Sequence, residues 1–114
     1  MSEYHKYLSD ISPETTNHGS GLKYVFLSNE AMNSPLTQIA YGQFQSGERC
    51  EEHVHATMDE CFFFLKGRGN YLVGDVNVEL LPNTFLRIPA GTKHSLVAGK
   101  EGPLEFVYWG VATD

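Results

Sequence analysis

The stretch GERCEEHVHATMDECFFFLKG, residues 47–67, places two histidines one residue apart and a glutamate just before an apolar run. Because side chains alternate between the two faces of a strand, His53 and His55 point to the same side if this segment is extended. Glu60 lies at the edge of the apolar segment 61–65, where an ionised carboxylate is costly unless something compensates its charge. A divalent cation held by these three side chains would supply that compensation.

A third histidine follows a turn further along the chain. In the segment Pro89-Ala-Gly91-Thr-Lys-His94, a Pro-x-Gly turn delivers His94 to the start of the apolar segment 94–98. Three imidazoles and one carboxylate form a mixed nitrogen and oxygen set that suits iron(II), manganese, nickel, cobalt or zinc. The predicted ligands of one such divalent metal ion are His53, His55, Glu60 and His94.

Two other interpretations of the histidine pair stay open. The chain has five histidines in 114 residues, so one His-x-His pair can occur without any metal-binding role. Alternatively, Cys50 and Cys61 could complete a structural zinc site with the pair, because thiolates and imidazoles are the usual ligands of closed zinc sites. In unbroken strands, however, Cys50 lies on the opposite face to His53, and Cys61 on the opposite face to Glu60. Both thiols are then expected to behave as small buried side chains.

Composition indicates one folded domain with a single core, since hydrophobic residues make up 41% and aromatic residues 12% of the 114. Eight basic and 14 acidic residues give a net charge of −6, which argues against a nucleic-acid partner. No apolar run is long enough to cross a bilayer, and Met1–Lys6 lacks the apolar segment of a signal peptide. We therefore expect a cytoplasmic protein with reduced cysteines and no membrane association.

Most of the chain alternates between short β-rich runs and turn residues. Strands are expected at 22–27, 36–44, 60–65, 70–73, 76–81, 84–88, 94–98 and 104–111. Gly74-Asp75 favours a type II′ hairpin turn. No window has helical periodicity, so we predict an all-β sandwich or barrel with no helix longer than about two turns. Residues 1–21 are polar and are expected to form an N-terminal arm before a single domain at 22–114.

These motifs resemble those of the cupin superfamily, and in particular its small single-domain members of the cupin 2 type. The first cupin motif is Gly, five residues, His-x-His, three or four residues, Glu, six residues and Gly. It is matched at Gly47, His53, His55, Glu60 and Gly67.

The second cupin motif is matched in part. Its Pro-x-Gly, two residues, His portion fits Pro89, Gly91 and His94. Asn83 stands where the leading glycine belongs, and asparagine tolerates the left-handed turn conformation better than most residues. Ala98 replaces the closing asparagine, which is not one of the metal ligands.

The resemblance implies a single jelly-roll β-barrel with the four predicted ligands at its mouth around one metal ion. It does not determine a reaction, because this fold hosts dioxygenases, isomerases, epimerases, decarboxylases, sugar-binding sensors and storage proteins. We expect a metal-dependent enzyme acting on a small organic substrate, of the dioxygenase type or the sugar isomerase or epimerase type. The alternative is a stand-alone module that binds or senses a small metabolite or sugar without catalysis.

Further side chains are candidates for contact with that small-molecule ligand. Tyr41 and Gln43 share one face of the segment 36–44, and an inward-facing Arg87 would suit a carboxylate or phosphate. Phe62 and Phe64 share the face of Glu60, although core packing also explains them. The candidate substrate-binding residues are Tyr41, Gln43, Phe62, Phe64 and Arg87.

Apolar side chains are also expected on the outside of the barrel. Cys61, Phe63 and Leu65 face away from Glu60, and Tyr108 or Trp109 in the last segment adds to this surface. Because a small barrel cannot hide this much apolar surface, we predict a homodimer.

Overall fold

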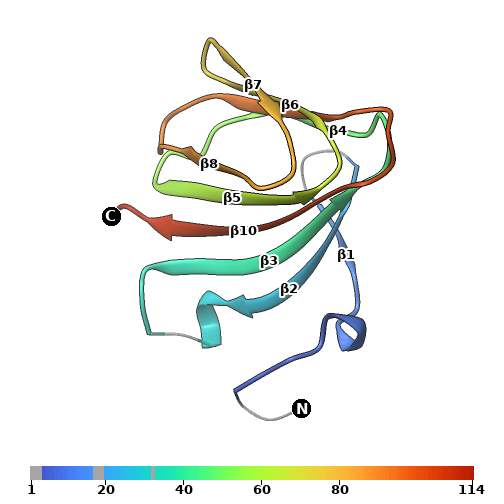
Figure 1. Ribbon diagram of the computed structural model, residues 1–114. Helices are drawn as coiled ribbons and strands as arrows, with labels where there is room; N and C mark the ends of the chain where they lie inside the picture. Colours follow the sequence, from blue (N-terminus) through green and yellow to red (C-terminus); the bar gives the residue numbers. More distant parts are fainter. Residues whose placement is uncertain (1–3, 17–19, 32) are drawn as a thin grey trace.

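The computed structural model describes residues 4–16, 20–31 and 33–114, so residues 1–3 and 17–19 of the predicted arm lie outside the described residues. The described chain forms two facing antiparallel sheets (Figure 1). The strands are β1 (Glu14–Thr15), β2 (Leu22–Ser28), β3 (Leu36–Phe44), β4 (Arg49–His53), β5 (Met58–Lys66), β6 (Gly69–Val73), β7 (Val76–Leu80), β8 (Thr84–Ile88), β9 (His94–Ala98) and β10 (Leu104–Ala112).

The order of the strands is that of a jelly roll. One sheet has six strands in the order β1-β2-β3-β10-β5-β8, and the other has four in the order β4-β9-β6-β7. In the described part of the chain the strands form two separate sheets and not one closed barrel, which corrects that detail of the predicted fold class. The all-β jelly-roll architecture itself is confirmed.

Local sequence signals explain several of the connections. Gly74 has φ of 57° in the two-residue turn between β6 and β7, as a type II′ turn requires at its first position. Asn83 has φ of 71°, so it adopts the left-handed conformation expected at the position of the motif glycine. Within the described residues the helices are η1 (Leu8–Asp10) and η2 (Asn29–Ala31), both short 3-10 turns. The prediction of no long helix is therefore confirmed, and no described helix has the length and apolar character to cross a bilayer.

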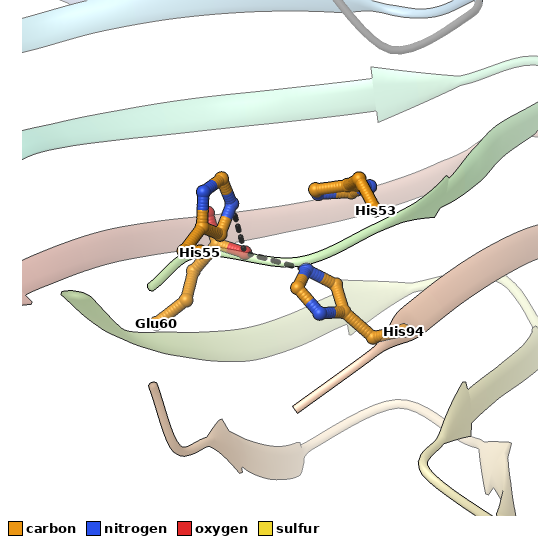
Figure 2. Close-up of side chains that lie close together, drawn as sticks. All are labelled: His53, His55, Glu60 and His94. Carbon is orange, nitrogen blue, oxygen red and sulfur yellow. Dashed lines mark ion pairs between the residues drawn. The ribbon is translucent and has the colours of Figure 1, made fainter. Parts of the chain in front are cut away.

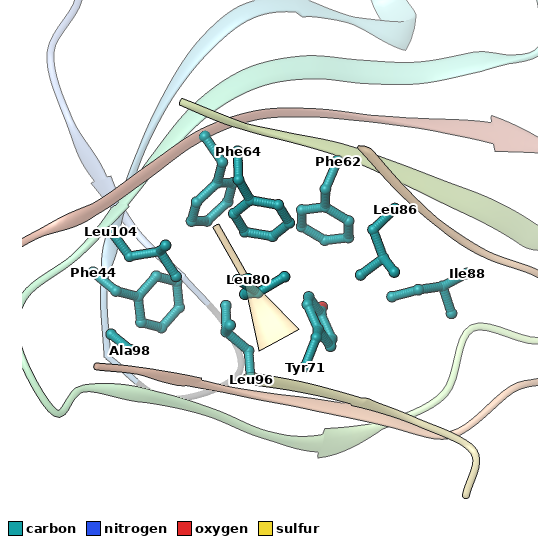
Figure 3. Packing of buried hydrophobic residues seen from close by; sticks show 11 residues of the cluster. Phe44, Phe62, Phe64, Tyr71, Leu80, Leu86, Ile88, Leu96, Ala98 and Leu104 are labelled. Carbon is teal, nitrogen blue, oxygen red and sulfur yellow. The ribbon is translucent and has the colours of Figure 1, made fainter. Parts of the chain in front are cut away.

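The core lies between the two sheets (Figure 3). Alternation along the strands places Phe62 and Phe64 of β5 on the inner face, where they pack against Tyr71 of β6 and Phe106 of β10. Ring centroids in these four contacts are 5.2 to 6.5 Å apart, within the range of favourable aromatic pairs. The other buried members are Phe44, Leu80, Leu86, Ile88, Leu96, Ala98 and Leu104.

Part of the predicted arm joins the larger sheet. Glu14 and Thr15 of β1 pair with Lys23 and Leu22 of β2. This short strand covers the edge of β2, which would otherwise be open to pairing with another chain. The division into an arm and a domain stays a prediction.

Apolar side chains do reach the outer face of the six-stranded sheet. Cys61 lies opposite Trp109, and Phe63 lies opposite Phe85, which is 57% exposed. Tyr108 was an alternative candidate for this surface, and that expectation is wrong. Tyr108 pairs with Phe62 and faces the interior, because it lies two residues from the inward-facing Phe106 in β10 and shares its face.

Two glycines of the first cupin motif provide a matched test of the fold. Gly47 and Gly67 both have positive φ, at 77° and 85°, so alanine strains the backbone at either position. An added Cβ meets nothing within 4 Å at Gly47 but lies 2.3 Å from the Pro103 carbonyl oxygen at Gly67.

We therefore expect Gly67→Ala to lower the free energy of unfolding by roughly 1–3 kcal/mol more than Gly47→Ala. Urea denaturation of both variants measures the difference. Equal losses of stability would show that β5 and β10 do not approach each other closely at Gly67.

Candidate metal centre

The four predicted metal ligands come together at one end of the space between the sheets (Figure 2). His53 is the last residue of β4, His94 is the first residue of β9, Glu60 lies in β5, and His55 lies in the connection between β4 and β5. One ligand atom from each residue lies within 4.8 Å of the other three. Ligands on opposite sides of an ion at about 2.1 Å are roughly 4.2 Å apart, so the cluster has the size of a metal site.

Backbone pairing brings these segments together. His53 lies opposite His94 where β4 pairs with β9, and Glu60 lies opposite Ile88 where β5 pairs with β8. Ile88 leads directly into the Pro-x-Gly turn, and the Gly91 amide donates a hydrogen bond to the His55 carbonyl at 2.8 Å. The turn that delivers His94 is thus tied to the loop that carries His55.

Backbone carbonyls orient two of the imidazoles. His53 Nδ1 lies 2.8 Å from the Glu51 carbonyl oxygen, and His94 Nδ1 lies 2.9 Å from the Thr92 carbonyl oxygen. A carbonyl only accepts, so each Nδ1 carries the proton and the lone pair of each ring lies on Nε2. Metal-ligating histidines in proteins are commonly fixed in this way.

The donor set fits a divalent cation. Glu60 Oε1 lies 3.5 Å from His94 Nε2 and 3.7 Å from His55 Nε2, so these atoms surround a common point without forming hydrogen bonds with each other. His94 is 2% exposed, and its Nε2 is buried without a hydrogen-bond partner in the described chain. A buried nitrogen lone pair without a partner is costly, and a metal ion is one group that would satisfy it.

The surroundings of His53 favour the neutral form of its imidazole. Burial lowers the pKa of His53, and the neighbouring His94 and His55 lower it further, against the Glu51 carbonyl and the Glu60 carboxylate. A lowered pKa means that this imidazole is neutral at pH 7, which is the form that binds a metal.

A small cavity of about 70 Å³ extends from the cluster into the core. Its walls are largely aromatic and aliphatic, and His53 and Glu60 face it from the metal side. Burial raises the pKa of Tyr71 and of Tyr108, with the Glu60 charge adding in both cases, so both phenols keep their protons at neutral pH. The further wall residues include Cys50, Phe62, Tyr71, Leu96, Phe106 and Tyr108.

The position of Cys50 differs from the expectation. The register of β4 against β9 shifts between Cys50 and His53, so simple alternation fails there, and the Cys50 Sγ lies 3.7 Å from His53 Nδ1. Burial, with Glu60 and Glu51 adding, raises the pKa of the thiol to about 12. Among the described residues, the group of side chains whose ligand atoms lie within 4.8 Å of one another contains His53, His55, Glu60 and His94 and does not include Cys50. Cys61 lies on the outer face, as expected.

The candidate substrate-binding residues divide between the cavity and other places. Phe62 lines the cavity, whereas Phe64 is fully buried in the core beyond it. Tyr41 and Gln43 lie on the outer face of β3, and the Tyr41 hydroxyl donates a hydrogen bond to Glu105. The structure does not bring these two side chains to the cluster. Both lie an odd number of residues from the inward-facing Phe44 and therefore on the opposite face of β3.

Arg87 also lies outside the cavity. Its Nη2 is 2.7 Å from Asp59 Oδ2 on the outer face, and Asp59 Oδ1 accepts a hydrogen bond from the Ala90 amide at 2.9 Å. The hydrogen bonds to Ala90 and Arg87 lower the pKa of Asp59. Arg87 and Asp59 thus hold the turn before His94 against β5, a role that the sequence pattern did not reveal for Asp59.

We expect Cys50→Ser and Cys61→Ser to retain the metal content of the wild-type protein. Cys50 does not belong to the group of converging ligand atoms, His53 Nδ1 is occupied by a carbonyl, and Cys61 faces outward. Metal analysis of the purified variants by mass spectrometry measures this directly. Loss of metal from either variant would support the mixed thiolate and imidazole site instead.

Comparison with known proteins agrees with this geometry. The chain matches the Cupin domain family model over residues 40–110, whereas no curated protein sequence matches it. A predicted oxalate decarboxylase from Thermotoga maritima has a TM-score of 0.85 at 24% identity, covering 93% of this chain and 96% of that one. The polyketide cyclase RemF from Streptomyces resistomycificus has a TM-score of 0.80 at 15% identity, covering 100% and 81%.

A third solved structure, KdgF from Halomonas sp., has a TM-score of 0.76 at 16% identity and covers 95% of this chain and 93% of that one. At these identities the solved structures establish a shared fold and nothing about a shared reaction. The family match spans most of the chain and includes all four residues of the metal cluster. The chain therefore belongs to the cupin family.

Proposed function

We propose that His53, His55, Glu60 and His94 hold one divalent transition metal ion, and that the protein is a metal-dependent enzyme acting on a small organic molecule. The observation that carries this proposal is the convergence of four ligand atoms on one point beside a cavity, with His94 Nε2 buried and lacking a hydrogen-bond partner in the described chain. A purely structural cluster would have its buried nitrogen satisfied by the protein.

The number and type of ligands favour catalysis over a purely structural role for the metal. Four protein ligands leave positions open on an octahedral ion, and a bound metal of this kind polarises substrate oxygen atoms or supports oxidative chemistry. The chain contributes the other requirements. Tyr71 and Tyr108 present protonated hydroxyls near Glu60, and Phe62 and Phe106 exclude water from one side of the cavity.

Two reaction types fit this arrangement, and the metal would separate them. Iron(II) would favour oxidation of the dioxygenase type, whereas zinc or manganese would favour isomerisation or epimerisation of a sugar. Two proteins with the same fold are named as a predicted oxalate decarboxylase and a polyketide cyclase, so this fold is compatible with an enzymatic role. A small metabolite-binding module without catalysis is the alternative that the experiments below distinguish.

We expect His94→Ala to reduce metal content several-fold while the domain remains folded, because removing one of four ligands weakens metal binding whereas the hydrophobic core holds the sheets together. The matched control is His5→Ala, which removes an exposed histidine far along the chain from the cluster. Metal content is measured on protein purified without a chelating column, and circular dichroism checks the fold.

A His94→Ala variant with full metal content would contradict the assignment of the ligands. Anaerobic reconstitution with each candidate metal, followed by an oxygen-uptake screen and product analysis, then separates the reaction types. Ligand binding without product under every metal would favour the binding module.

We also infer that the protein forms a homodimer through the outer face of the six-stranded sheet. This face carries Cys61, Phe63, Phe85 and Trp109 as neighbours in the register, and Phe85 and Leu65 are 57% and 39% exposed. A contiguous apolar surface of this kind is unusual on a small monomer. A second copy of the same chain would cover it.

Phe85→Asp is therefore expected to yield a monomer at tens of micromolar, because a charge in the buried centre of an apolar interface is costly. Val76→Asp is the matched control, since Val76 is 62% exposed but belongs to the other sheet. Sedimentation velocity gives the mass of each species. A monomeric wild-type protein, or a Phe85→Asp variant that remains dimeric, would contradict this interface.

A further inference from the structure

A second cavity, of about 220 Å³, opens on the other side of the metal cluster and has a polar lining. His55 and Glu60 line it from the side of the cluster, and Thr16, Glu60 and Tyr108 line both this cavity and the apolar one. The hydrogen-bond donors that face it are Thr16, Lys23, Gln38 and Tyr108. We call this space the mouth cavity.

Lys23 reaches the mouth cavity from the inner face of β2. In the register of the sheet it lies opposite Gly42 of β3. A Cβ at Gly42 would lie 2.3 Å from the Phe106 ring, which shows that this register position faces the interior. Cross-strand partners share a face, so the Lys23 side chain starts from that face as well.

The charge of Lys23 has no ion-pair partner within 4.0 Å among the described carboxylates, although Glu14 lies opposite it in β1. Among the described residues that line the mouth cavity, Lys23 is a cation and Glu60 an anion. The charge of Lys23 would add to that of a bound metal ion.

Tyr108 supplies a hydroxyl group next to this charge. Its side chain faces inward, stacks on Phe62 at a ring separation of 5.5 Å, and lines both cavities. A phenol hydroxyl can donate a hydrogen bond to an acceptor that binds there.

We propose that the mouth cavity binds the carboxylate of a small organic anion, with Lys23 as its ion-pair partner and Tyr108 as a hydrogen-bond donor. The remainder of the molecule extends past Glu60 into the apolar cavity beside Phe62. A neutral sugar would gain little from Lys23, whereas a carboxylate gains a charge-assisted hydrogen bond. This inference rests on the proposed metal-dependent function and assigns its substrate class.

The two volumes limit the size of the anion. Pockets for drug-sized ligands measure roughly 300–1,000 Å³. The mouth cavity of about 220 Å³ and the apolar cavity of about 70 Å³ are each smaller, so the ligand is a small acid with a short chain or a single ring.

The test compares carboxylates with their neutral amides. Butyrate and benzoate, and as controls butyramide and benzamide, are titrated calorimetrically into wild-type protein with and without bound manganese. We expect the carboxylates to bind more tightly than the amides. Lys23→Met should weaken carboxylate binding by roughly tenfold to a hundredfold, as expected for loss of a hydrogen bond to a charged group. Tyr108→Phe should weaken it by a smaller factor.

Two controls isolate the role of Lys23. Lys23→Arg keeps the positive charge and should retain most of the affinity. Lys100→Met removes the same charge from an exposed position after β9 and should bind like the wild type. Because amides carry no charge, their binding should not change in Lys23→Met.

The possible results test carboxylate binding in the mouth cavity and metal binding by the cluster separately. Equal affinity for carboxylates and amides, or unchanged carboxylate affinity in Lys23→Met, would overturn the assignment of the mouth cavity while leaving a measured metal content intact. A wild-type protein that holds no metal would instead overturn the proposed function. In that case the metal-free titrations of wild type and Lys23→Met still decide whether the mouth cavity recognises a carboxylate.

Discussion

The position of β5 inside the larger sheet, with β10 on one side and β8 on the other, determines what the interior of this protein contains. Pairing on both edges fixes its register, and a shift by one residue would exchange its two faces. Glu60 therefore faces the same interior as Phe62 and Phe64, while Asp59 and Cys61 face outward. A carboxylate is held at the boundary of an aromatic core by the same hydrogen bonds that stabilise the sheet.

The four-stranded sheet carries two of the three imidazoles, those of His53 and His94, on its paired strands. His53 and His94 lie opposite each other at the ends of paired strands, and local backbone carbonyls fix both rings. The Asp59 and Arg87 pair on the outer face holds the turn that precedes His94. The positions of the clustered side chains are thus determined by backbone pairing and by contacts outside the cavity.

Much of this arrangement follows from sequence pattern because the signals are local. Alternation places Phe62 and Glu60 on one face, and spacing in the two motifs selects the four side chains that the structure brings together and the turns that carry them. The shifted register at Cys50 could not be predicted, because a bulge changes parity without leaving a sequence signal. The side chains of Tyr41 and Arg87 could bind an organic ligand, but both face outward. For Tyr41 this could have been predicted, because it lies three residues from the inward-facing Phe44 and therefore on the opposite face of the strand. Lys23 reaches the site only through the long-range pairing of β2 with β3.

Anomalous diffraction from crystals of the protein loaded with zinc or manganese tests the metal site directly, because it locates the metal independently of any activity. One strong peak is expected at about 2.0–2.2 Å from a nitrogen of His53, His55 and His94 and from an oxygen of Glu60. A peak bonded to the sulfur of Cys50 or Cys61, or the absence of any peak between these four side chains, would contradict the proposed site.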